Sequence, residues 1–262
     1  CPSEFFFTSG GTEGDNMILR CCVEDLGVNH IITSGLEHHA VLHTAEELRD
    51  ELGIKLSLVN VCNKGKVDLN HLEELLKEGG KTLVSLMHAN NEIATKLPLK
   101  QVGEMCKAHD ALFHSDTVQT MGHYAFDFQD VNLHFATCAA HKFHGPKGIG
   151  FLYMSSDVQL KPMITGGAQE RNMRAGTENI YGIVGLAKAL ELAYEDVEGH
   201  QQSIQSVKSY MIERLKEAIP GVSFNGDSES TDSLYTVLNV CFPSSDVDEM
   251  FLYHLDIEGI SV

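Results

Sequence analysis

The feature that most constrains this chain is a regular alternation of short apolar runs with amphipathic stretches, which continues as far as Met154. Runs rich in apolar and β-branched residues predict strands, and the stretches between several of them have the periodicity of helices. Strand–helix–strand repetition predicts βαβ units and a mainly parallel sheet flanked by helices. We expect strands at residues 4–9, 30–34, 56–61, 82–88, 111–115, 134–138 and 148–154.

Apolar residues at helical spacing predict helices over residues 41–52, 69–76 and 99–109. Asp68 is expected to cap the N-terminus of the second helix, because its side chain can accept a hydrogen bond from the first free backbone N–H groups. Gly79 is expected to end that helix, because glycine adopts the left-handed conformation common after a last helical turn.

After Met154 the pattern changes from βαβ repetition to an α+β pattern. Two long helices, short strand patterns and a short helix are expected at residues 180–197, 203–219, 222–225, 235–242 and 246–255. Pro220 is expected to end the second long helix. We therefore predict two domains, a major one over residues 1–197 and the beginning of a smaller one over residues 198–262.

Charge and composition argue against several classes of protein. The sequence has 19 Lys and Arg against 37 Asp and Glu, a net charge of −18, which disfavours binding to nucleic acids or anionic lipid. No apolar stretch approaches the roughly 20 residues of a membrane span, and no secretory signal pattern is visible. The seven cysteines are odd in number and include no CxxC pair, so we expect reduced thiols in a cytoplasmic protein.

Both ends of the sequence lie within apolar patterns. The chain starts at Cys1 directly before the strand-like EFFFTSGG and stops at Val262 within IEGISV. Domain termini are usually polar and frayed. We expect the sequence to be a piece of a longer chain.

Polar residues of unusual type follow five of the predicted strands. In open α/β sheets, ligands bind at the carboxyl ends of the strands. Because all five groups meet at one edge, a single site is expected there. The strand ends supply Thr12, His38, Asn91, Asp116, Gln119, His141 and Lys142.

The segment SGGT before the first helix offers free backbone N–H groups and a hydroxyl at the positive end of a helix dipole. Such a place suits a phosphate, although a tight turn between strand and helix explains the same residues. No GxxxxGKS/T motif is present, so a nucleotide P-loop is not supported.

Three further residue types fit the remaining parts of one cofactor. Lys142 at a strand end suits a Schiff-base amine, although an ordinary surface lysine is the simpler interpretation of that residue alone. Asp116 suits a carboxylate that keeps a pyridine nitrogen protonated, and the His38 imidazole could stack on a ring. With Asn91 and Gln119 as partners for a phenolic oxygen, the set matches pyridoxal 5′-phosphate.

Six sequence blocks resemble, in family order, those of the cysteine desulfurases in the class V aminotransferase group. The blocks are FTSGGTEGDN, HIITSGLEHHAVLHT, LVSLMHANNEIA, HSDTVQTMG, AHKFHGPKGIGFLY and GGAQERNMRAGTEN, and the resemblance covers essentially the whole chain. It implies the fold-type I architecture of pyridoxal-phosphate enzymes (aspartate aminotransferase-like) and a homodimer. It also implies conversion of L-cysteine to L-alanine, with the sulfur passed as a persulfide to an enzyme cysteine and then to an acceptor protein for iron–sulfur clusters or thiolated tRNA.

The same resemblance assigns roles to individual residues. Lys142 corresponds to the Schiff-base lysine, Asp116 to the pyridinium partner and His38 to the stacking residue, and these three are the expected catalytic residues. The remaining cofactor contacts are Asn91 and Gln119 at O3′, Gly11, Thr12 and His141 at the phosphate, and Thr177, which would reach the phosphate of the other subunit.

The chain departs from the family pattern in two ways. Ala139 stands where the family usually has a phosphate-binding hydroxyl. None of the seven cysteines aligns with the family's nucleophile, which we expect beyond Val262 together with the arginine that binds the substrate carboxylate. The 262 residues alone should therefore form little persulfide.

Several alternatives remain open at this point. A selenocysteine lyase, another class V enzyme such as an aminotransferase or a kynureninase-like lyase, or an inactive cofactor-binding scaffold would share much of this pattern. Glu37, His38, His39 and His43 could also suggest a metal site. We expect no metal, because no further ligand cluster is visible and the cofactor interpretation already uses His38.

Overall fold

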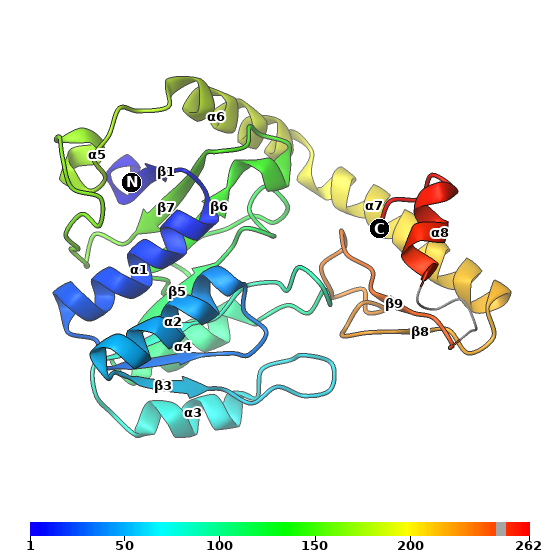
Figure 1. Ribbon diagram of the computed structural model, residues 1–262, viewed down its shortest axis with the longest axis horizontal. Coiled ribbons are helices and arrows are strands. Elements are labelled where there is room, and N and C mark those ends of the chain that lie inside the picture. Colours follow the sequence, from blue (N-terminus) through cyan, green and yellow to red (C-terminus); the bar gives the residue numbers. More distant parts are fainter. Residues whose placement is uncertain (245–249) are drawn as a thin grey trace.

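Seven strands form one mixed sheet in the computed structural model, which describes residues 1–244 and 250–262 (Figure 1). The sheet order is β1-β7-β6-β5-β4-β2-β3, and every strand except β7 runs in the same direction. This confirms the mainly parallel sheet predicted from the sequence. The strands are β1 (Phe5–Thr8), β2 (His30–Thr33), β3 (Lys55–Leu58), β4 (Thr82–Ser85), β5 (Leu112–Asp116), β6 (Phe135–Ala139) and β7 (Gly150–Met154).

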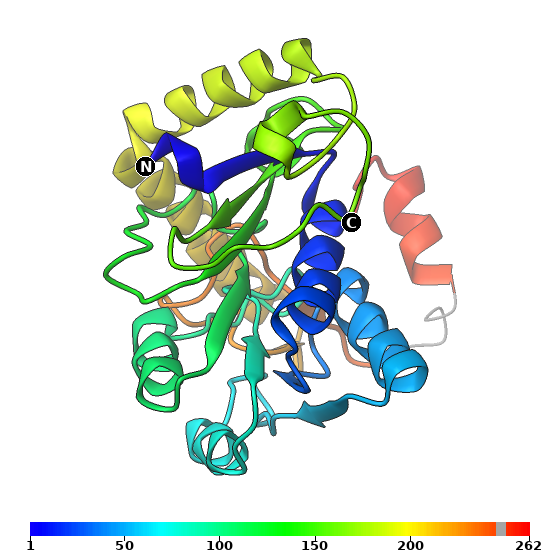
Figure 2. The same cartoon turned by 90° about the vertical axis from the view of Figure 1, so that its left-hand side faces the viewer.

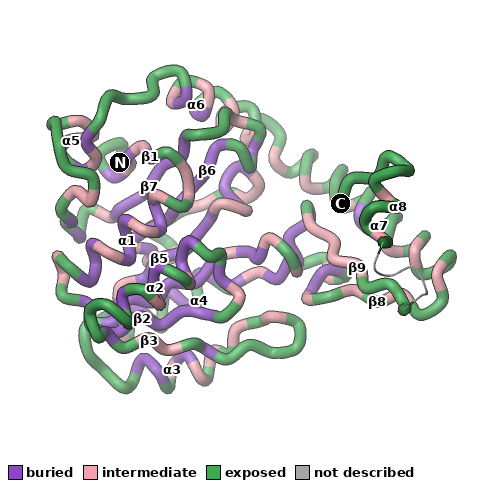
Figure 3. The backbone as a smooth tube through the Cα atoms, viewed as in Figure 1, coloured by how far each residue is buried: buried purple, intermediate pink, exposed green. Residues whose placement is uncertain are grey.

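Helices cover both faces of the sheet, as Figure 2 shows. α1 (Gly11–Leu26) and α2 (His39–Leu52) pack on one face, and α3 (Leu69–Lys77) and α4 (Leu99–Ala108) pack on the other. The central strands are buried on both faces, which explains why their sequences are apolar almost throughout. Burial is concentrated in the sheet and on the inner helix faces (Figure 3).

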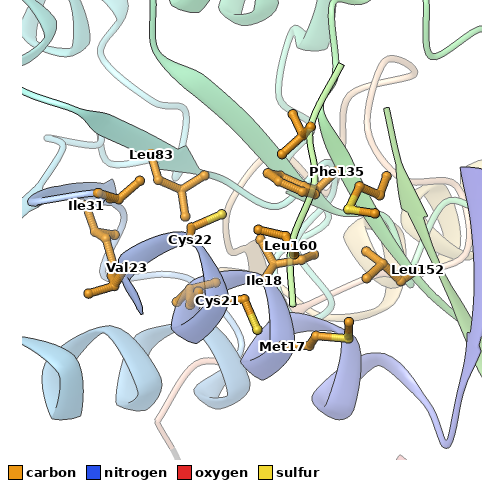
Figure 4. Close-up of a cluster of buried hydrophobic side chains, with 14 of the residues drawn as sticks. Met17, Ile18, Cys21, Cys22, Val23, Ile31, Leu83, Phe135, Leu152 and Leu160 are labelled. Atoms are coloured by element: carbon orange, nitrogen blue, oxygen red, sulfur yellow. The ribbon is translucent and has the colours of Figure 1, made fainter. Parts of the chain in front are cut away.

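The adjacent residues Cys21 and Cys22 belong to the core between α1 and the sheet (Figure 4). They are 4% and 0% exposed and neither forms a disulfide. Burial raises the pKa of the Cys21 thiol to about 12. These thiols are therefore packing residues, as their place in an apolar helix pattern predicts.

Most element ends agree with the sequence patterns. The Asp68 side chain accepts hydrogen bonds from the backbone N–H groups of Asn70 and His71 at 3.0 and 3.2 Å, which confirms it as an N-cap. Gly79, two residues after the end of α3, has a φ of +78°. The strand predicted at 56–61 is wrong by several residues, because β3 is the edge strand and leaves the sheet after Leu58.

The C-terminal part begins with two long helices, α6 (Ile180–Glu195) and α7 (Val197–Ala218). α7 starts six residues earlier than predicted, because the Asp196 side chain caps it by accepting a hydrogen bond from the Gly199 N–H at 3.1 Å. The proposed domain boundary at residue 197 falls at the first turn of α7 and stays a prediction.

α7 carries the chain away from the sheet toward a small antiparallel pair and a last helix (Figure 1). These elements are β8 (Ser223–Phe224), β9 (Val240–Cys241) and α8 (Phe251–Ile257). The strand predicted at 235–242 is thus only two residues long. Of the helix predicted at 246–255, residues 246–249 lie outside the described residues, and the described helix extends two residues further. None of the helices described is long and apolar enough to cross a membrane.

The segment between β8 and β9 returns to the carboxyl edge of the sheet. The Leu234 N–H donates to the Ala94 carbonyl at 2.8 Å, and the Asp227 N–H donates to the Ile93 carbonyl at 3.2 Å. Both acceptors belong to the loop that carries Asn91. The C-terminal part is therefore attached directly to one of the predicted site loops.

Candidate active site

The ends of five strands that run in one direction surround a cavity of about 220 Å³. Every predicted site residue except Thr177 lines this cavity, so the structure brings together residues that lie up to 131 positions apart in the sequence, from Gly11 to Lys142. The cavity is lined by Gly11, Thr12, Asp15, His38, Met87, Asn91, Asp116, Val118, Gln119, Ala139, His141 and Lys142.

Asp116 is the last residue of β5 and is buried at the base of this cavity. Its carboxylate accepts a hydrogen bond from the Val118 N–H at 2.8 Å, and no ion pair to it is found among the described residues. Burial raises the pKa of Asp116 above its usual value, although that hydrogen bond and the positive charge of Lys142 oppose the rise. A buried carboxylate of this kind suits a ligand that brings its own positive charge or N–H donor.

His38 is the N-cap of α2, and this position fixes its ring. The Ala40 N–H donates to His38 Nδ1 at 3.1 Å, so Nδ1 is an acceptor and the ring proton lies on Nε2. The side chain is exposed and lines the cavity. The ring is therefore oriented by the backbone of its own helix and is free to contact a ligand.

The N-terminus of α1 forms the part of the cavity that suits an anion. α1 begins at Gly11, and Thr12 is exposed in its first turn. A Cβ atom on Gly11 would lie 2.7 Å from Val118 Cγ2, so glycine allows the helix start to approach the segment after β5. Free N–H groups, a hydroxyl and a positive dipole end are the donors a phosphate needs.

Lys142 follows β6 in a short 3₁₀ turn, η2 (Ala140–Phe143). This turn places His141 and Lys142 on the cavity, whereas Phe143 is buried beneath it in the core. Ala139, the last residue of β6, is 2% exposed and lines the cavity as well. The departure from the family pattern at Ala139 therefore lies within the candidate site.

Sequence reasoning missed the buried carboxyl groups next to Asp116. Asp15 lines the cavity from α1 and accepts a hydrogen bond from Thr137 Oγ1 at 2.7 Å. Burial raises its pKa, with a further contribution from the negative charge of Asp116. The available signal was an acid on the buried face of α1, which also contains Ile18 and Cys22.

Thr177 does not lie on the cavity that contains Lys142. It is exposed and lines a separate cavity of about 70 Å³ beside Ser9, Glu170 and Arg174. The contact of Thr177 with a cofactor phosphate therefore stays a prediction, as does its expected reach into a second subunit.

The possible metal site at the start of α2 is not supported. His39 and His43 stack with their ring centroids 4.4 Å apart. In residues 1–244 and 250–262, no three His, Cys, Asp or Glu side chains are grouped so that they could hold a metal ion.

Comparison with known proteins identifies the family to which the chain belongs. The model of the aminotransferase class-V family matches residues 2–262. The chain belongs to the class-V aminotransferase family. Pyridoxal 5′-phosphate is the cofactor of this family, and the donor set of the cavity fits its phosphate, ring and aldehyde.

Relatives within the class-V family carry desulfurase names. The chain is 42% identical over 262 residues to "Putative cysteine desulfurase IscS 1" of Bacillus subtilis and 40% identical over 260 residues to "Cysteine desulfurase IscS" of Clostridium botulinum. These alignments cover 99% and 98% of this chain but 68% and 65% of the relatives. The chain thus spans about two thirds of the length of the curated relatives it matches.

Solved structures agree with this assignment. A structure titled "NIFS-LIKE PROTEIN" matches with a TM-score of 0.91 and 37% identity, covering 100% of this chain and 71% of the other. DndA from Streptomyces lividans matches with a TM-score of 0.85 and 29% identity, covering 98% and 73%. The predicted fold-type I class and the resemblance to cysteine desulfurases are confirmed.

Proposed function

We propose that the full-length protein is a cysteine desulfurase that converts L-cysteine to L-alanine and passes the sulfur to an enzyme cysteine. The observation that carries the proposal is the convergence of Lys142, Asp116 and His38 on one cavity. The names of the relatives at 40–42% identity support the choice of substrate.

The cofactor, when bound, supplies a ring that withdraws electrons from the amino acid it holds. Lys142 would hold the cofactor through Nζ and then move protons with the same amine once the substrate has displaced it. The Asp116 carboxylate would keep the ring nitrogen protonated, and the His38 imidazole would stack on the ring. The backbone N–H groups at Gly11 and Thr12, with His141, would bind the phosphate.

The sulfur step needs a thiolate placed beside the substrate. The thiolate attacks the sulfur of L-cysteine, the carbon–sulfur bond breaks, the sulfur stays on the enzyme as a persulfide, and the carbon takes a proton to give L-alanine. No cysteine is among the described residues that line the cavity, and Cys138 behind Ala139 is fully buried. Burial raises the Cys138 pKa well above its usual value, which makes it a poor nucleophile.

The test is product formation by the full-length protein loaded with pyridoxal phosphate. We expect L-alanine and sulfide in equal amounts from L-cysteine in the presence of dithiothreitol. Lys142→Ala should abolish both products, whereas Lys147→Ala, an exposed lysine of the same loop, should not. Cofactor binding without release of either product from L-cysteine would contradict the proposal and favour a scaffold or another class V reaction.

We propose further that the protein is a homodimer in which Thr177 reaches the partner's phosphate site. Support comes from the helix that follows Thr177, where Ile180, Tyr181 and Val184 are 58%, 93% and 63% exposed. Three apolar side chains on one exposed helix face favour a protein contact. Light scattering of the full-length protein should give twice the mass of one chain, and Tyr181→Asp should reduce the measured mass. A wild-type monomer that holds the cofactor at micromolar concentration would contradict the dimer.

The sulfur acceptor and the location are proposals as well. We propose a cytoplasmic enzyme whose acceptor is a protein of iron–sulfur cluster assembly or tRNA thiolation. The seven free cysteines suit a reducing compartment and support the location, and the desulfurase name of the Bacillus subtilis relative supports only a release of sulfur that an acceptor would take up. Mass spectrometry of proteins that gain a sulfur atom from the ³⁵S-loaded enzyme would identify the acceptor.

A further inference from the structure

The histidine at position 123 contacts the backbone of Lys142 on the side away from the candidate site. Its Nε2 lies 3.1 Å from the Lys142 carbonyl oxygen, and its Nδ1 lies 2.7 Å from the Tyr235 hydroxyl. Lys142 is thus connected through one imidazole ring to a tyrosine of the C-terminal part, 93 residues further along the chain.

The two partners determine which ring nitrogen carries the proton. A carbonyl oxygen only accepts hydrogen bonds, so Nε2 must carry the hydrogen and donate to Lys142. Nδ1 is then an acceptor, and the Tyr235 hydroxyl donates to it. Burial, with smaller contributions from the charges of His144 and His200, lowers the pKa of His123, although its hydrogen bond to the Lys142 carbonyl opposes the shift; the neutral form is therefore favoured. The Tyr235 hydroxyl therefore supports the tautomer that the Lys142 carbonyl requires.

His123 and Tyr235 are each fixed by further contacts of their own. The backbone N–H of His123 donates to the Thr120 carbonyl at 3.0 Å, and its own carbonyl accepts a hydrogen bond from the Gln201 side chain on α7. Tyr235 is 5% exposed, and its ring lies 5.7 Å from that of Tyr124. The imidazole therefore has little freedom to leave the Lys142 carbonyl.

His123 does not take part in the cavity that holds the predicted site residues. It lines a separate groove of about 370 Å³, whose walls include Phe143, Leu192, His200 and Tyr235. The Lys142 side chain lines the other cavity. His123 thus contacts the lysine through the backbone only and has no described contact with the space for substrate or cofactor.

We propose that His123, oriented by Tyr235, is a positioning residue that fixes the Lys142 peptide and so the direction in which its amine enters the candidate site. This inference rests on the proposed function of Lys142. The hydrogen bond from His123 to the Lys142 carbonyl limits rotation of the turn that carries the lysine. A lysine that must both hold a cofactor and move protons needs a fixed orientation of its amine.

The test compares four variants of the full-length protein loaded with pyridoxal phosphate. His123→Leu removes the hydrogen bond, and His123→Gln keeps an N–H donor at about the same reach. Tyr235→Phe removes the hydroxyl that supports the tautomer. Leu192→Ala is the control, because Leu192 lines the same groove and its side chain has no atom that could bond to or charge the imidazole.

Two readouts separate positioning from general structural support. The first is the pH midpoint of the visible absorbance of the lysine-bound cofactor, which we expect to shift by about half a unit in His123→Leu. The second is the split of kinetic constants: kcat for L-cysteine should fall roughly threefold to tenfold while KM stays unchanged. His123→Gln and Leu192→Ala should match the wild type, and Tyr235→Phe should shift the midpoint in the same direction by less.

Each outcome decides the proposal. An unchanged midpoint and kcat in His123→Leu would overturn it, as would equal losses in His123→Leu and His123→Gln. If His123→Leu does not fold, an unchanged midpoint in Tyr235→Phe would overturn it instead. If the wild type itself shows no lysine-bound cofactor, the proposed function fails, which is distinguishable from failure of the His123 role alone.

Discussion

Glu37 accepts a hydrogen bond from the backbone N–H of Met87 at 2.9 Å, which places a buried carboxyl group directly behind a residue of the candidate site. Its other carboxyl oxygen accepts from Ser34 Oγ at 2.8 Å. Burial, together with the nearby charge of Asp116, raises the pKa of Glu37 to about 8, although these hydrogen bonds oppose the shift. The carboxyl is therefore mostly protonated at neutral pH.

This raised pKa predicts a specific dependence of stability on pH. Between the ordinary value of 4.5 and about 8, the folded state keeps a proton that the unfolded state has lost, so stability falls as pH rises. The free energy of unfolding should fall by up to about 1.4 kcal/mol per pH unit more in the wild type than in Glu37→Gln. Urea unfolding at several pH values between 5 and 8 measures this free energy of unfolding. Glu92→Gln, at an exposed position, is the control, and parallel curves for wild type and Glu37→Gln would rule the effect out.

Replacing Ala139 by serine should make the protein bind pyridoxal phosphate more tightly. The Ala139 methyl group lines the cavity where the family usually has a hydroxyl, so Ala139→Ser should add one hydrogen bond to the phosphate. The Kd for pyridoxal phosphate should fall by roughly twofold to 100-fold, the range from an ordinary hydrogen bond to one with a charged group. Fluorescence titration of the apoprotein measures it, with Ala139→Gly as a control that adds no hydroxyl. A serine variant that binds no more tightly than the wild type would place the phosphate elsewhere.

Asp116 and Asp15 provide a matched pair of buried carboxyl groups on one cavity. Asp116→Asn keeps the acceptor for the Val118 N–H but cannot keep a ring nitrogen protonated, so turnover should fall by at least about 100-fold. Asp15→Asn should cost much less, because the Asp15 carboxyl already binds Thr137 and is not assigned to the ring. Steady-state rates with L-cysteine decide this, and equal losses in the two variants would contradict the assignment of Asp116.

Gly11 allows the close approach of α1 to the segment after β5. Gly11→Ala would place a Cβ atom 2.7 Å from Val118 Cγ2 and displace the first turn of the helix. Overpacking of this kind costs roughly 1–3 kcal/mol, so the affinity for pyridoxal phosphate should fall by about fivefold to 100-fold. Val118→Ala in the same chain should restore most of the affinity. Failure of the double variant to recover would show that the clash is not the cause.

The strand-end residues were predictable from sequence because the carboxyl ends of parallel strands meet at one edge. Asp116, His38 and Lys142 each follow a strand whose apolar pattern is clear, and the structure places all three on one cavity. The resemblance to a family then supplied their roles. Their positions relative to the strands needed only the period of the sequence pattern.

Side chains that act through tertiary contacts were not predictable in this way. Glu37 was weighed only as a metal ligand, because nothing in its local sequence shows that Met87 will donate to it from another strand end. The contact of His123 with Lys142 and Tyr235 likewise joins segments separated by loops. Element ends set by local capping, such as the start of α7 at Asp196, were missed because the apolar pattern begins later than the cap.

The most direct test of the account is the identity of the lysine that holds the cofactor. The full-length protein loaded with pyridoxal phosphate would be reduced with borohydride and digested, and the labelled peptide would be identified by mass spectrometry. Lys208 is the main competitor, because burial lowers its pKa to about 8, although its amine donates to Ser233 Oγ and the Leu234 carbonyl away from the cavity. The account predicts a single label on Lys142, and a label on Lys208 or any other lysine would contradict it.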